Sequence, residues 1–182
     1  MEKKYILTDD VIDFNSHTLH RIKAVRDFDC VKAGDLGGFI ESEKNLDHDG
    51  AAWVTDSAHV SGAAFVTGAA VVSGDARVSG VAVVSGAARV TGDAWVTGVA
   101  WVTGDAVVSG AADFAVISGF GRVFRTTTFF RCKDNLVRCQ CGCFYGTVDE
   151  FRAKVRETHG NSKYAKEYLM IADLMELHFK ED

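Results

Sequence analysis

Small apolar residues recur with a period of six through the central third of the chain. From Ala51 to Gly110 the sequence contains ten consecutive hexads, nearly all of the form x-Ala-x-Val-(Ser/Thr)-Gly. Within a hexad the alanine and the valine are two residues apart, so on a strand both point to the same face. The residue between them varies freely, which indicates an outward position. The pattern therefore predicts short strands joined by corners, in units that are stable only when stacked on their neighbours.

The segments on either side of the hexads have different patterns. The N-terminal segment predicts a β cap, with strands at 5–8 and 19–25. After Gly110 the period fails, and the run Thr126–Phe130 favours a strand. A capping-box pattern at Thr147–Glu150 begins a helix, and a second helix begins near Ser162. The expected segments are a cap at 1–50, the repeat at 51–119, a basic and aromatic segment at 120–146 and a helical hairpin at 147–182.

The hexads resemble those of the hexapeptide-repeat family, whose fold is a left-handed parallel β-helix with three hexads in each triangular coil. Three flanking segments, at 18–28, 34–42 and 45–46, resemble the N-terminal signature of phage and prophage hexapeptide-repeat proteins. The run Gly142–Thr147 resembles the start of their C-terminal helical segment. The resemblance implies a mainly β fold: a left-handed β-helix of just over three coils, with an N-terminal β cap and a C-terminal helical hairpin.

If three hexads make one coil, outward residues fall into three columns, and one column is apolar at every varying position. A solvated face does not have this composition, so we expect it to be covered. Proteins of this family are often trimers packed side by side, which favours a second copy as the cover. The chain's own C-terminal helices are the alternative. The expected interface residues are Phe65, Val81, Val83, Val99, Trp101 and Trp95.

The composition and the charge indicate a class of protein but do not indicate a function. The 182 residues carry a formal net charge of −5 and include no proline. No apolar run approaches the ~20 residues of a membrane span, and the charged start leads into no signal-peptide core. We therefore expect a soluble, cytoplasmic protein with no membrane partner, in the host cytoplasm if a phage encodes it. The five cysteines are odd in number and four cluster near one end, which favours reduced thiols.

The family resemblance suggests acyl transfer as an alternative function. Hexapeptide acyltransferases use a histidine as general base and typically have a loop that walls the site. His59 is the only histidine within the hexads, and His48 lies just before them. No hexad is interrupted by an insertion, so we expect no catalytic residue and no cofactor. Should the protein be an enzyme, it is an acyl-CoA-dependent transferase with His59 or His48 as base.

Three cysteines at alternate positions, Cys139, Cys141 and Cys143, are the candidate metal ligands. On one strand their thiols share a face, but the Cβ atoms then spread over ~13 Å, too far for one tetrahedral zinc ion. A turn at Gly142, with Cys132 or His159 as a further ligand, could restore a site. Because the paired C-x₂-C spacing of structural zinc is missing, we favour buried structural cysteines and expect no metal.

A basic and aromatic run between residues 120 and 143 is the candidate ligand site. Arginine forks suit phosphates, and aromatic rings stack on bases. The expected ligand-binding residues are Arg122, Arg125, Arg131, Lys133, Arg138, Phe129 and Phe130. In the alternative, the phenylalanines close the end of the coil and the arginines are solvated. The remaining charge is acidic, which argues against long double-stranded nucleic acid.

The patterns favour a non-enzymatic, homo-oligomeric protein, and the resemblance implies that it is a phage accessory protein that inhibits host antiviral defence. It would bind either a host defence protein or a small anionic nucleotide signal. A purely structural role in the virion or its assembly is a further alternative to the acyltransferase.

Overall fold

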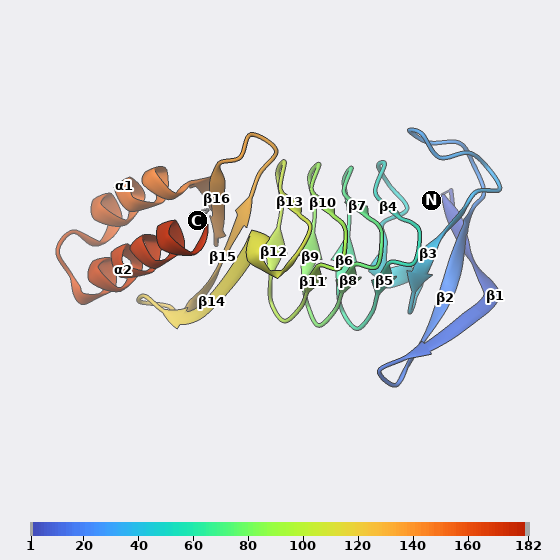
Figure 1. The fold of residues 1–182 in the computed structure, drawn as a ribbon, viewed down its shortest axis with the longest axis horizontal. Helices are drawn as coiled ribbons and strands as arrows, with labels where there is room; N and C mark the ends of the chain where they lie inside the picture. Colours follow the sequence, from blue (N-terminus) through green and yellow to red (C-terminus); the bar gives the residue numbers. More distant parts are fainter. Residues whose placement is uncertain (1, 181–182) are drawn as a thin grey trace.

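The computed structural model describes residues 2–180, and its parts follow one another along a single axis (Figure 1). An antiparallel cap occupies the N-terminal end, and a β-solenoid of about four turns forms the middle. An antiparallel sheet and two helices form the C-terminal end. Within residues 2–180 no helix is long and apolar enough to cross a membrane.

The solenoid consists of two-residue strands whose alanine and valine side chains fill its interior. Trp53 pairs in parallel with Val71, eighteen positions further along the chain, and Val71 pairs with Arg89 in the same way. The alanine and the valine of every hexad are buried, so the sequence prediction of their inward orientation is confirmed. The strands are β4 (Trp53–Val54), β5 (His59–Val60), β6 (Phe65–Val66), β7 (Val71–Val72), β8 (Arg77–Val78), β9 (Val83–Val84), β10 (Arg89–Val90), β11 (Trp95–Val96), β12 (Trp101–Val102) and β13 (Val107–Val108).

The N-terminal cap covers the first open edge of the solenoid. It consists of β1 (Tyr5–Phe14), β2 (His17–Ala24) and β3 (Leu36–Ile40), so strands form in both predicted ranges. β3 pairs in parallel with β5 and continues one solenoid face into the cap. On another face the Asn45 side chain donates to the carbonyls of Gly62 and Ala64, at 3.0 and 2.9 Å. These contacts satisfy backbone groups that an open edge leaves unpaired.

A four-stranded antiparallel sheet closes the other end. Its strands are β14 (Phe114–Phe120), β15 (Arg125–Arg131), β16 (Val137–Cys141) and β17 (Phe144–Thr147), in that order. Phe130 joins the core of the solenoid, whereas its neighbour Phe129 joins the core under the helices. The sheet therefore has an apolar residue on each face and lies between two hydrophobic cores. It begins at Phe114, before the segment boundary expected at residue 120.

The predicted helical hairpin is present as α1 (Val148–His159) and α2 (Lys163–His178). Thr147 and Glu150 form the capping box of α1, and Ser162 caps α2. Figure 1 shows both helices beyond the sheet at the end of the solenoid. They do not cover the apolar solenoid face, so the alternative in which they do is wrong. Val81, Val99 and Trp101 expose 53%, 48% and 44% of their surface.

Candidate anion-binding site

A pocket of about 360 Å³ lies where the β14–β15 turn and the β16–β17 turn meet the two helices. Basic side chains come from three places: Arg122 from the first turn, Arg125 from the start of β15, and Lys154 and His159 from α1. Aromatic side chains come from three: Phe144 from β17, Phe151 from α1 and Tyr168 from α2. Among residues 2–180, the lining contains no carboxylate side chain. The pocket therefore combines positive charge with an aromatic surface.

Within the described part of the chain, the two arginines of the pocket have no partner that neutralises them. Both are exposed, and within residues 2–180 neither guanidinium group forms an ion pair or a hydrogen bond. Arg125 lies against the backbone of Gly142, where φ is +61° and a Cβ atom would overlap Nη1 of Arg125. Lys154 differs, because its Nζ lies 2.9 Å from a carboxylate oxygen of Glu157. Most of the available positive charge is thus on Arg122 and Arg125.

Aromatic rings in mutual contact form the floor of the pocket. Phe144 contacts Phe151 with ring centroids 5.7 Å apart, and Phe151 contacts Tyr168 at 5.6 Å. His159 stacks on Tyr168 at 5.8 Å. The Tyr168 hydroxyl donates to the carbonyl of Phe120 at 3.3 Å, and burial raises the pKa of this phenol. Packing between sheet and helices therefore fixes the floor, because each ring contacts a neighbour.

The sequence-predicted ligand residues are divided among different environments. Arg122 and Arg125 line the pocket, but the other cations lie elsewhere. Arg131 lies 3.5 Å from Asp113 and donates to the carbonyl of Phe179, while Arg138 binds Asp134 at 2.6 Å. Lys133 is exposed at the start of the β15–β16 turn.

Phe129 and Phe130 were expected to contact the ligand, but both are fully buried. Neighbouring residues of a strand point to opposite faces, so the two rings enter separate cores. Phe130 packs at the end of the solenoid, as the alternative interpretation of the phenylalanines expects.

Lys154, His159 and Tyr168 are pocket residues that the sequence did not indicate for anion binding, and His159 was considered only as a further metal ligand. They lie on helices whose apolar spacing predicts core packing, and Tyr168 indeed belongs to the helical core. A signal exists on α1, where polar Lys154 and Thr158 interrupt the stripe of Phe151 and Val155. A polar residue on such a stripe indicates that part of the face is not buried.

The three candidate metal-ligating cysteines do not converge. Cys139 is fully buried among the side chains between sheet and helices, and burial raises the pKa of its thiol. Cys141 accepts a hydrogen bond from the Thr127 hydroxyl at 3.1 Å, and Cys143 is exposed in the β16–β17 turn. In the described part of the chain, no three His, Cys, Asp or Glu side chains are grouped so as to hold a metal ion.

The two candidate general bases hold the cap against the solenoid. His59 lies between Phe14 and Phe39, with ring centroids 5.0 and 5.8 Å away, and burial together with nearby Arg77 lowers its pKa. His48 stacks on Tyr5 at 4.3 Å, and its Nδ1 accepts from the backbone N–H of Lys4. Neither histidine lines the pocket.

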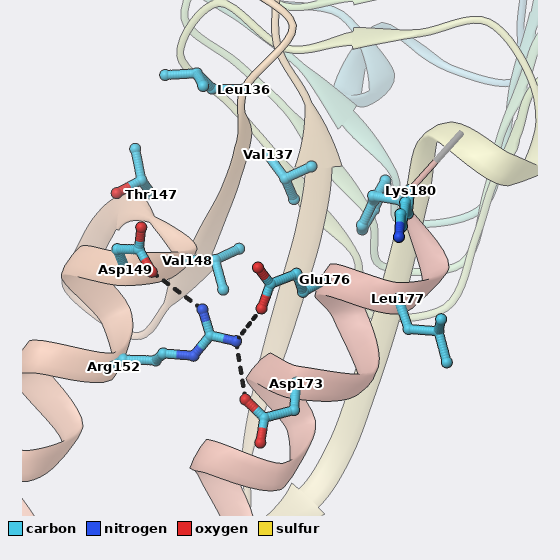
Figure 2. A pocket seen from close by; sticks show the side chains of 11 residues that line it. Leu136, Val137, Thr147, Val148, Asp149, Arg152, Asp173, Glu176, Leu177 and Lys180 are labelled. Atoms are coloured by element: carbon cyan, nitrogen blue, oxygen red, sulfur yellow. Dashed lines mark hydrogen bonds and ion pairs between the residues drawn. The ribbon is translucent and has the colours of Figure 1, made fainter. Parts of the chain in front are cut away.

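A second groove, of about 670 Å³, lies on the other side of the helical hairpin (Figure 2). Its central cation, Arg152, lies 3.1 Å from Asp149, 2.9 Å from Asp173 and 2.6 Å from Glu176. The contacts with Asp173 and Glu176, drawn as dashed lines in Figure 2, join α1 to α2, whereas the contact with Asp149 lies within α1. Because Arg152 is already bound by carboxylates of the same chain, its charge is neutralised, and Lys180 is the other cation that lines this groove among residues 2–180.

No protein-family model matches the chain, and no curated protein has a sequence significantly similar to it. The fold defines a β-solenoid protein, and its basic pocket lies outside the solenoid, in the C-terminal sheet and helices.

Proposed function

We propose that this protein binds a small phosphorylated anion in the pocket of Arg122, Arg125, Lys154 and His159. The observation that carries the proposal is the pair of exposed arginines, neither of which is ion-paired within residues 2–180. A guanidinium group donates two parallel hydrogen bonds to a phosphate and keeps its charge at every physiological pH. The aromatic floor beneath them excludes water from one side of a bound anion, which strengthens the charge interaction.

The protein holds the anion without changing it. His59 and His48 pack the cap onto the solenoid and take no part in the pocket. His159 and the thiols of Cys141 and Cys143 do line the pocket. Among the described residues, however, neither thiol is hydrogen-bonded to His159, as a histidine-activated cysteine nucleophile would be. Turnover of acetyl-CoA by the purified protein would contradict this part of the proposal.

The biological role follows from the sequence resemblance. We propose a left-handed hexapeptide-repeat β-helix of the phage accessory type, acting in the host cytoplasm. Retaining a small anionic signal of antiviral defence lowers its free concentration and so inhibits the defence. The basic pocket favours such a signal over a defence protein as the target, because its charge lies in a recess of about 360 Å³.

The apolar solenoid face supports self-association, and we propose that copies of the chain pack side by side through it as a trimer. Phe65 and Val83 are partly exposed, and Trp101, Val81 and Val99 are exposed. Contiguous apolar surface of this kind marks an interaction site.

Thermal unfolding in the presence of AMP or ribose 5-phosphate tests the proposed anion binding. We expect the melting temperature to rise with ligand concentration, since a ligand at 100 times its Kd stabilises the fold by about 2.7 kcal/mol. The variant R122A/R125A should lose this shift. Raising the salt concentration should weaken it in the wild type, because exposed charges are screened.

The matched control is Arg89→Ala, which removes an exposed arginine from the solenoid. It should keep the full ligand-induced shift. A double variant that responds like the wild type, or a wild type that responds to neither compound, would overturn the proposal.

A further inference from the structure

The turn between β14 and β15 exposes apolar side chains at the rim of the pocket. Val123 and Phe124 leave 59% and 73% of their surface accessible. The flanking residues Arg122 and Arg125 line the pocket, as does Val123. Phe124, which does not itself line the pocket, therefore lies in the chain between the two cations that the proposed function assigns to the phosphate.

Helix α2 fixes one end of this turn. The backbone N–H of Gly121 donates to a carboxylate oxygen of Glu167 at 3.0 Å, and the Tyr168 hydroxyl donates to the carbonyl of Phe120. A Cβ atom at Gly121 would overlap the Tyr168 ring, so only glycine permits this close approach. Because Tyr168 also belongs to the pocket floor, the turn is held at a fixed position relative to the floor.

Phe124 itself is in an unfavourable conformation. Its φ is +52°, in the left-handed region that a bulky side chain rarely occupies. The ring gains little from packing, since it is mostly exposed. Strained residues of this kind cluster at active sites and at ligand-binding sites. The folded chain alone thus gives no reason for an aromatic residue at this position.

We infer that the anion is a nucleotide, with its phosphate on Arg122 and Arg125 and its base stacked on Phe124. The inference rests on the proposed function and adds the group that distinguishes the ligand from other phosphorylated compounds. Any base presents a flat π face to an aromatic side chain, so Phe124 selects for a base without reading its identity.

Calorimetric titration with AMP and ribose 5-phosphate at one ionic strength tests the role of the base. We expect AMP to bind the wild type at least about five-fold more tightly, from the lower end of measured base–aromatic stacking. In Phe124→Asn the affinity for AMP should fall to that for ribose 5-phosphate, whose own affinity should stay unchanged. Asparagine tolerates the left-handed conformation, so this variant keeps the turn and removes only the ring.

Two further measurements separate a binding defect from a folding defect. Phe124→Asn should melt no lower than the wild type, and Phe124→Tyr, which restores a ring, should restore the preference for AMP. The inference is overturned if the wild type binds both compounds with equal affinity, or if Phe124→Asn binds AMP as the wild type does. Neither result contradicts the proposed anion site. Failure of both compounds to bind the wild type overturns the proposed function itself.

Discussion

His59 lies in a column of rings and guanidinium groups on one outer face of the solenoid. Phe14 reaches this face from the tip of the β1–β2 hairpin, and the Arg77 guanidinium lies 4.7 Å from the Phe14 ring and 5.7 Å from that of Trp95. Cation–π contacts of this kind favour an uncharged ring next to each cation. A protonated His59 would instead add a second positive charge beside Arg77. The environment thus makes this histidine a packing residue and lowers its pKa.

The lowered pKa of His59 makes the stability of the protein depend on pH. In the unfolded chain the imidazole has its ordinary pKa of about 6.5, so below that pH the unfolded state binds a proton that the folded state resists. We therefore expect the melting temperature to fall as the pH is lowered from about 7.5 to 5. His59→Phe keeps a ring in the column, and its melting temperature should change less with pH in this range.

The control for this experiment is His178→Phe, at the exposed end of α2. In this variant the melting temperature should depend on pH as it does in the wild type. A His59→Phe profile that runs parallel to that of the wild type would rule out His59 as the source of the pH dependence.

At the scale of elements, strand β15 connects the solenoid to the helices. Phe129 pairs with Cys139 of β16 and packs at right angles against Phe151 of α1, with ring centroids 5.8 Å apart. On the other face, the Thr128 hydroxyl accepts a hydrogen bond from the backbone N–H of Trp101 at 3.0 Å. Because each face of the sheet packs on a different core, closure of the solenoid and support of the pocket depend on the same strand.

Phe130→Ala tests the closure of the solenoid by the sheet. The ring is fully buried in the solenoid core, so its removal leaves a cavity and should lower the free energy of unfolding by about 3–5 kcal/mol. Urea unfolding measures this loss. Phe124→Asn, which removes an exposed ring of the same size, should cost nothing. A loss below about 1 kcal/mol for Phe130→Ala would mean that the sheet does not seal the core.

On the scale of the whole molecule, both ends of the solenoid are covered by the chain itself, whereas one long side is not. The cap and the antiparallel sheet occupy the ends (Figure 1). The uncovered side holds Val81, Val99 and Trp101, and the Trp101 indole donates to the Ser85 hydroxyl at 3.3 Å. A closed rod of this kind has its side available for packing against copies of itself.

Light scattering of Trp101→Lys tests this packing. We expect the wild type at three times the chain mass of 19.7 kDa, and the variant at a lower mass because a buried charge opposes association. Arg89→Glu, on a different solenoid face, should keep the wild-type mass. A wild type at the mass of one chain, or a variant with the wild-type mass, would remove this face as an interface.

The sequence alone determined the stacked solenoid, the strands of the cap and both helices. These features depend on local spacing: alanine and valine two apart, hexads that repeat, and capping residues at fixed offsets. It also indicated Arg122 and Arg125, because cationic and aromatic residues alternate around them.

Only the tertiary structure decided which of the predicted side chains are available to a ligand. The pocket draws on residues as far apart as Arg122 and Tyr168, and no local pattern reveals that they meet. Arg131 and Arg138 resemble Arg122 in the sequence, but Arg131 lies beside Asp113, and Arg138 lies 3.8 Å from Asp105 in addition to binding Asp134 of its own turn. Whether a cation stays free depends on such long-range pairings, which form only when the chain is folded.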